Sequence, residues 1–157
     1  MNWDFLFNGA NMLALICWAA LILLPRSDTL RTLIFYLGAG LLCLTYTVLF
    51  GLLLSGMVDG NAVDGAGPAS FTSIEGVRNI FLSDGGVTVG WVHYLAFDLF
   101  VGLWIARDAD AKDFSRILQA IVLLITFLAG PVGLFIWLII REPAARRANP
   151  RKSKLKL

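Results

Sequence analysis

The stretch TVGWVHYLAFDLFVGLWIA, residues Thr88–Ala106, decides the fold. It contains no lysine or arginine, and its ionisable side chains other than tyrosine are His93 and Asp98. A helix that crosses a bilayer needs roughly 20 consecutive, predominantly apolar residues. The stretch therefore predicts a membrane-spanning helix that carries two ionisable side chains within its length.

Three further apolar runs flank this stretch on both sides. They cover Phe5–Leu24, Leu30–Leu54 and Ile117–Ile140. The whole chain is 58% hydrophobic and 15% charged, whereas soluble domains are about 45–50% apolar and about 25% charged. We expect an all-α, polytopic membrane protein with four transmembrane helices in a single domain, residues 1–140. The basic segment 141–157 is expected to be a disordered tail.

The first apolar run is expected to be a retained helix. A secretory signal peptide needs a basic segment ahead of a shorter apolar core. The residues before Phe5 include Asp4 and no lysine or arginine. The short link Arg26–Thr29 makes the first two predicted helices antiparallel neighbours.

The one long connection, Ser55–Val87, has two parts. Its first part is rich in glycine and aspartate, which indicates a flexible loop. In its second part, Thr72 and Glu75 fit a capping box, a pair of side chains that satisfies backbone donors at a helix start. We expect a short amphipathic helix that lies on the membrane face and ends at Gly85 and Gly86.

The distribution of cations bears on orientation and partners. Four spans would place both termini and the long connection on one side, with eight cations, against five on the other. Because cytoplasmic segments carry an excess of lysine and arginine, this count favours cytoplasmic termini. The basic tail is expected to meet anionic lipid headgroups. A net charge of +2 is too small to indicate a nucleic-acid partner.

The polar groups within the apolar runs are the candidate functional residues. An aspartate at the centre of a spanning helix costs roughly 2.5–3.5 kcal/mol on insertion scales, so Asp98 is a functional hypothesis by default. Without a cation nearby it is expected to be neutral, and a neutral acid can donate a proton. Tyr94 lies one turn before Asp98 and can hydrogen-bond to it, while His93 points roughly 140° away.

Further polar groups gather in the membrane half beneath the long connection. We expect a substrate-binding cluster there, which comprises Asn8, Asn11, Tyr46, Trp91 and the helix break at Pro131. Each has a structural alternative. Asparagines often join helices, a Gly-Pro pair often only kinks one, and tryptophans near helix ends often anchor it in the interface.

Several other chemistries lack support in the sequence. One histidine and two cysteines without a C-x-x-C pair build no familiar metal site. No phosphate-cradling glycine motif indicates a nucleotide cofactor. We therefore expect neither a metal nor a cofactor.

Four stretches carry a family resemblance. The run GWVHYLAFDLFVGLWIARDA resembles the signature of the abscisic-acid-deficient-four-like family. So do FNGANMLALICWAALILLP, FTSIEGVRNIF and LLITFLAGPVGL, which begin at Phe7, Phe71 and Leu123. The most specific part is a histidine followed five residues later by Asp-Leu-Phe, in combination with Gly-Pro-x-Gly.

The resemblance implies a chemistry. Plant members of this family are neoxanthin synthases, linked to isomerising the epoxy-carotenoid violaxanthin. Such a reaction opens an epoxide and removes a proton from carbon, which requires an acid and a base but no redox cofactor. His93, Tyr94 and Asp98 match the family signature and would fill these roles. The chain resembles a bacterial member, which implies the inner membrane and leaves the substrate open.

Three functions remain open on this basis. The first is an isomerase of a carotenoid or another lipid-soluble isoprenoid. The second is a non-enzymatic binding or assembly protein, whose polar cluster holds helices together. The third is a proton-coupled transporter with Asp98 as proton carrier, which would have to form an oligomer; the absence of a visible inverted repeat counts against it.

Overall fold

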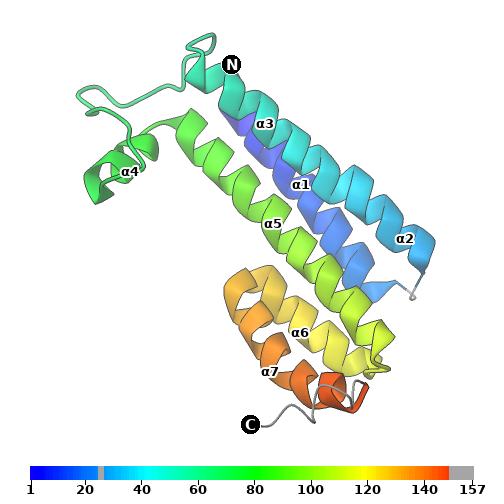
Figure 1. The fold of residues 1–157 in the computed structure, drawn as a ribbon. Helices are drawn as coiled ribbons and strands as arrows, with labels where there is room; N and C mark the ends of the chain where they lie inside the picture. The colour runs from blue at the N-terminus through cyan, green and yellow to red at the C-terminus, as the bar shows by residue number, and fades with distance from the viewer. Residues whose placement is uncertain (25–26, 149–157) are drawn as a thin grey trace. The chain divides into compact units, whose positions relative to one another are not determined.

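A computed structural model describes residues 1–24 and 27–148, with side chains up to Pro143. Within these residues every regular element is helical, and the one β-type pairing is an isolated bridge between Ala62 and Ser83. The elements are α1 (Trp3–Leu23), α2 (Asp28–Leu33), the π-helical segment η1 (Ile34–Gly40), α3 (Leu41–Leu54), α4 (Ile74–Ile80), α5 (Asp84–Ala111), α6 (Arg116–Leu128) and α7 (Gly130–Ala148). Figure 1 shows their arrangement within the chain.

Three helical segments of the described chain are long and apolar enough to cross a membrane. They are Trp3–Leu23, the continuous run Asp28–Leu54, and Asp84–Ala111. In the α5 window 50% of residues are buried inside the protein, against 22% in each of the other two. Helix α5 therefore forms the inner helix, and the other two present most of their apolar side chains outward, as lipid-facing helices do.

The prediction of four spans is not confirmed. Where one helix was expected over Ile117–Ile140, the chain forms α6 and α7, and α7 returns alongside α6 (Figure 1). The break lies at Ala129, whose φ of −155° and ψ of 82° leave the helical region. Pro131 follows, and its ring lacks the N–H that would continue the α6 hydrogen-bond ladder. The chain therefore reverses its direction at the Gly-Pro pair and does not continue as one long, kinked helix.

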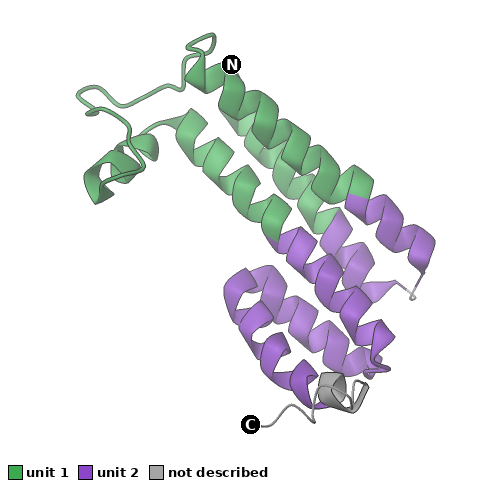
Figure 2. Ribbon diagram, in the orientation of Figure 1, with its two compact units in different colours: residues 1–16, 36–97 green, residues 17–35, 98–157 purple. Residues whose placement is uncertain are grey.

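The chain divides into two compact units (Figure 2). Unit 1 comprises residues 1–16 and 36–97, and unit 2 comprises residues 17–35 and the chain from residue 98 onward. Helix α1, the run Asp28–Leu54 and α5 each begin in one unit and end in the other.

Unit 1 is built around the start of α1, α3 and the first half of α5. Trp3, Leu49 and Val89, one from each of these helices, form its buried apolar core. The Trp3 indole donates a hydrogen bond to the carbonyl of Asp59, 3.2 Å away, which fixes the long connection to α1.

The long connection contains the short helix expected there, with different ends. Ser73, and not Thr72, caps α4 by accepting a hydrogen bond from the Gly76 N–H at 3.0 Å. Gly85 and Gly86 do not end α4, because α5 begins at Asp84 and contains both. The first eight residues of the predicted tail also differ, since α7 continues to Ala148. Residues 149–157, and the predicted helix end at Pro25, lie outside the described residues.

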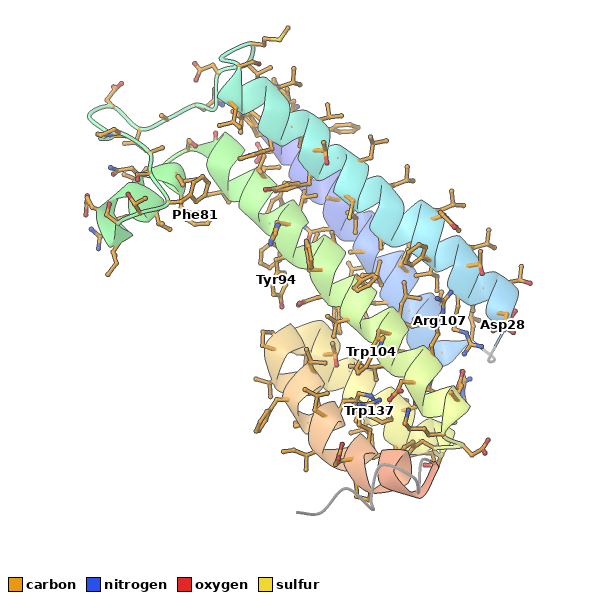
Figure 3. The ribbon with its side chains drawn as sticks, in the orientation of Figure 1. Asp28, Phe81, Tyr94, Trp104, Arg107 and Trp137 are labelled. Atoms are coloured by element: carbon orange, nitrogen blue, oxygen red, sulfur yellow. The ribbon has the colours of Figure 1, made fainter. Side chains whose placement is uncertain are left out.

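Unit 2 is closed by polar pairs and by close helix contacts. Asp108 near the end of α5 accepts hydrogen bonds from Trp137 (3.1 Å), which is labelled in Figure 3, and from Arg141 (2.6 Å) of α7, and it also pairs with Lys112. The Gln119 amide of α6 donates to the Ala106 carbonyl at 3.0 Å. The ends of α5 and α7 are thus fixed to each other by charge-assisted bonds, which are stronger than neutral ones.

Candidate functional site

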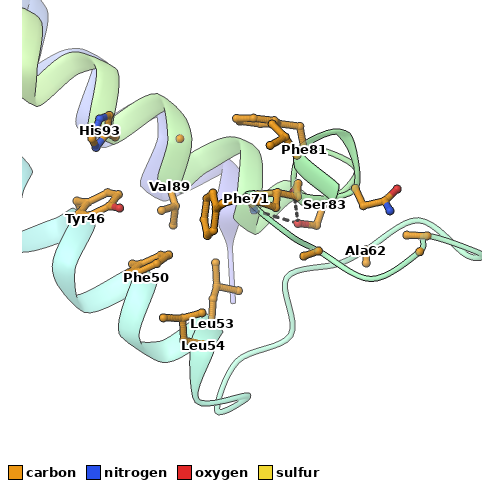
Figure 4. Close-up of a pocket in the computed structure, with 18 residues that line it drawn as sticks. Tyr46, Phe50, Leu53, Leu54, Ala62, Phe71, Phe81, Ser83, Val89 and His93 are labelled. Carbon is orange, nitrogen blue, oxygen red and sulfur yellow. Dashed lines mark hydrogen bonds between the residues drawn. The ribbon is translucent and has the colours of Figure 1, made fainter. Parts of the chain in front are cut away.

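A cavity of about 600 Å³ opens in unit 1 between α3, α4, the start of α5 and the long connection (Figure 4). This volume lies within the roughly 300–1,000 Å³ typical of small-molecule sites. Most of the lining is aliphatic, aromatic or glycine. The lining residues are Tyr46, Phe50, Leu53, Leu54, Ala62, Ala66, Gly67, Ala69, Phe71, Val77, Asn79, Ile80, Phe81, Ser83, Gly86, Val89, Gly90 and His93.

Two of the predicted site residues, His93 and Tyr46, lie together at one end of this cavity (Figure 4). Their ring centroids are 5.3 Å apart. Tyr46 also stacks on Phe50 at 5.4 Å, and His93 contacts Phe97 at 4.7 Å. These aromatic contacts orient the imidazole while its edge stays exposed at the cavity.

The opposite wall of the cavity belongs to α4 and the long connection, whose polar groups bond within the wall. The Asn79 amide donates to the Pro68 carbonyl at 3.2 Å. The Ser83 hydroxyl donates to the Ile80 carbonyl at 3.1 Å and accepts from the Gly86 N–H at 3.0 Å. The wall therefore presents a largely apolar surface to the cavity.

Glycines let α4 approach α5 closely. A Cβ atom at Gly90 would lie 2.6 Å from the Phe81 ring, and one at Gly86 would collide with the Ile80 carbonyl. The spacing of four residues puts both glycines on one face of α5. These contacts seat α4 directly on α5 and complete the cavity wall.

Trp91, Asn11 and Tyr94 form a separate group within unit 1. The Trp91 indole donates to the Asn11 side-chain oxygen at 2.8 Å, and its ring stacks on Phe7 (5.9 Å) and Tyr94 (5.1 Å). This group joins α1 to α5, and its members are not among the residues that line the cavity. Asn8, one turn earlier on α1 than Asn11, is exposed.

Asp98 belongs to unit 2 and is 9% exposed. Its carboxylate lies against Gly130, the first residue of α7, so that any Cβ at this position would collide with it. Thr126 and Gly133 make a second close approach of the same kind between α6 and α7. Pro131, beside Gly130, is exposed. Asp98 and Pro131 thus lie where α6 turns into α7.

The described residues contain no group of three or more histidine, cysteine or acidic side chains placed to hold a metal ion. Of the side chains that line the cavity, the His93 imidazole is suited to proton transfer. A neutral imidazole can accept a proton and an imidazolium can donate one.

Sequence reasoning did not identify the α4 side of the cavity. Phe71, Phe81 and Ser83 lie in a segment that was expected to be a loop, an interfacial helix and a helix end. One signal for it is present in the sequence: the small residues Gly86 and Gly90, spaced by four, are typical of a close helix contact in membranes.

The comparisons with known proteins identify the family. The family model described as ABA DEFICIENT 4-like matches residues 5–137, which is most of the chain, and the chain belongs to this family. Searches of curated proteins and of solved structures each found no significant match. The match covers α1 to the middle of α7, and it therefore includes both the cavity and the Asp98–Gly130 contact.

Proposed function

We propose that this membrane protein is an isomerase of a carotenoid or another isoprenoid lipid, which binds in the unit 1 cavity and exchanges protons with His93. The observation that carries the proposal is the position of the single histidine at one end of a largely apolar cavity. Such a cavity favours an apolar ligand with one polar group, because few convergent polar groups fix its orientation.

An isomerisation of an epoxide fits these groups without a further reactant. A C–O bond of the epoxide breaks, its oxygen takes up a proton, and a neighbouring carbon loses one. Atoms and electrons balance within the substrate, so the protein supplies an acid and a base only. The His93 imidazole is the group proposed to carry the proton, and the Tyr46 hydroxyl, on the ring beside it, is proposed to bind the substrate oxygen.

An acid that protonates a substrate in this cavity would have to lie at the cavity, and Asp98 lies elsewhere. Its carboxylate lies in unit 2 against the first residue of α7. We propose that it stabilises the α6–α7 turn. This role corresponds to the structural alternative given in the sequence analysis, in which an intramembrane polar group holds helices together.

The test is pigment conversion in bacterial cells that make epoxy-carotenoids. Wild-type protein should yield a product of unchanged mass and altered retention time in lipid extracts. His93→Gln, which keeps a polar side chain but carries no titratable proton at neutral pH, should lower product formation by a factor on the order of a hundred or more. Cys43→Ala, at an exposed position on α3, is the control and should convert as wild type does.

Binding without conversion is the rival function. It predicts that no isomer appears with wild-type protein, and that the substrate co-purifies equally with wild type and His93→Gln. Equal conversion by wild type and His93→Gln would also contradict the proposed role of the imidazole.

A further inference from the structure

The cations of the chain belong almost entirely to one of the two units. Unit 1 segments contain a single arginine, Arg78, and five carboxylates, a formal charge of −4. Unit 2 segments contain the other twelve cations and six carboxylates, a formal charge of +6. The twelve are Arg26, Arg31, Arg107, Lys112, Arg116, Arg141, Arg146, Arg147, Arg151, Lys152, Lys154 and Lys156.

The α6–α7 hairpin is too short to cross a bilayer. Helix α6 has 13 residues, about 20 Å at roughly 1.5 Å per residue. The apolar part of α7, up to Ile140, is shorter still. Both lengths fall below the roughly 30 Å of a bilayer's hydrocarbon core.

Both open ends of the hairpin lie at the end of α5. Arg141 of α7 pairs with Asp108 of α5 at 2.6 Å. Phe114, in the link from α5 to α6, contacts the Trp137 ring of α7 at a centroid distance of 5.0 Å. The chain that leaves α5 at Ala111 therefore comes back to the same end of α5 before residue 142.

We propose that α6–α7 is a re-entrant hairpin, which enters and leaves the membrane from one face, and that this face binds the anionic headgroups of the cytoplasmic leaflet. Cytoplasmic segments collect lysine and arginine. Among the described residues, the three spanning segments then leave Arg31, Arg107, Lys112, Arg116 and Arg141 on this face, against Arg78 on the other. The N-terminus and the long connection lie on the opposite face. This replaces the expectation of two cytoplasmic termini, which depended on a fourth span.

The side chains around the end of α5 suit a headgroup interface. The Arg141 guanidinium lies over the Trp104 ring at 5.2 Å, and that of Arg107 lies over Phe35 at 5.8 Å. Arg116 donates to the Leu24 carbonyl. Tryptophan rings and snorkelling arginines are typical of the membrane–water interface, and cations near an anionic surface are attracted to it.

The orientation also indicates from which membrane leaflet the substrate enters, a consequence that rests on the proposed function. Phe71 and Ile74, beside the cavity, are 75% and 82% exposed. Apolar side chains at a spanning helix's end are suited to the adjoining leaflet. The cavity would then exchange an isoprenoid substrate with the non-cytoplasmic leaflet.

The test is labelling of single cysteines in the full chain, with Cys17→Ala and Cys43→Ala as parent. A membrane-impermeant maleimide is applied to intact cells and to permeabilised cells. Asp64→Cys should react in intact cells, whereas Ala111→Cys and Glu142→Cys should react only after permeabilisation. Fusions of a fluorescent protein and of a periplasmic phosphatase to the C-terminus give a second readout, which does not depend on the cysteine-free parent folding.

Two results would overturn the proposal. Labelling of Asp64→Cys and Glu142→Cys from the same side, with Ala111→Cys on the other, would establish a fourth span. Labelling of Ala111→Cys and Glu142→Cys in intact cells would reverse the orientation. Neither measurement requires a substrate, so a failure here leaves the proposed isomerase to its own test.

Discussion

The two halves of α5 differ in how they use polar side chains. In unit 1, the first half of α5 lines a cavity of about 600 Å³ with His93 exposed to it. In unit 2, the second half adjoins a cavity of only about 20 Å³, and Asp108 is bonded to Trp137, Arg141 and Lys112. Fifteen residues along one helix therefore separate a polar group that lines a cavity from one that is bonded to other protein side chains.

This difference teaches how to interpret intramembrane polar residues. Both His93 and Asp98 are costly to place in an apolar environment, and cost alone makes both of them candidates for chemistry. Their neighbours distinguish them, because His93 lines a space large enough for a ligand while Asp98 touches the backbone of α7. If the comparison holds, polar changes in unit 2 lower stability, and the polar change in the unit 1 cavity lowers activity alone.

Gly130→Ala should have the largest effect on stability. The added methyl group would collide with the Asp98 carboxylate, and overpacking of this kind costs about 1–3 kcal/mol. Gly51→Ala is the control, since its Cβ meets nothing within 4 Å and alanine favours a helix over glycine by up to about 1 kcal/mol. Thermal unfolding in detergent should show a loss for the first variant only; equal behaviour would contradict the close contact.

The variant Asp98→Asn tests whether Asp98 stabilises the α6–α7 turn or acts as an acid in the reaction. Exchange of a carboxyl oxygen for an amide nitrogen at the α7 start alters the buried polar contacts of this side chain and should lower stability by about 1–2 kcal/mol. Conversion of substrate should stay within a few-fold of wild type, when cells are matched for protein level. A fall of a hundred-fold with unchanged stability would instead assign Asp98 to the chemistry, as the sequence first suggested.

Arg141→Ala removes one of the partners of Asp108. Because Lys112 and the Trp137 indole remain bonded to this carboxylate, we expect a modest loss of about 1 kcal/mol, in the range of a partly exposed ion pair. Chemical unfolding of the purified protein would measure it. The double variant with Lys112→Ala should lose more than the sum of the single changes, since both cations that pair with Asp108 are then gone.

His93→Gln should have the smallest effect on stability. The side chain is exposed and held by ring contacts, and a substitution at such a position usually changes stability within about 0.5 kcal/mol. The unfolding midpoint should therefore match that of wild type while pigment conversion falls. A clear drop in the midpoint would mean that the imidazole supports the fold, and the contrast between the two halves of α5 would fail.

The sequence predicted the spanning helices well, because their evidence is local. The run expected over Phe5–Leu24 is α1 (Trp3–Leu23), and the run Leu30–Leu54 is helical from Asp28 to Leu54. Each boundary depends on apolar content and on neighbouring cap residues. The family resemblance was likewise correct, since its motifs are contiguous in the chain.

The α6–α7 hairpin could not be predicted from the sequence, because the same residues are compatible with two structures. Gly130 and Pro131 interrupt a helix in either case, and the apolar length of Ile117–Ile140 suits a span. The choice depends on a contact with Asp98, more than thirty residues earlier, into which only glycine fits. The cavity was missed in part for the same reason. The spacing of Gly86 and Gly90 indicates a close contact, but their partners at the end of α4, Ile80 and Phe81, are seen only in the structure.

The shortness of α6 has a consequence for how the protein is made. Its 13 residues are fewer than an insertion machinery needs to release a helix sideways into lipid. The C-terminal hairpin can therefore enter the membrane only as a pair, after α5 is already in place to receive it. Biogenesis then has a fixed order, in which three helices are threaded during synthesis and the last two fold in afterwards.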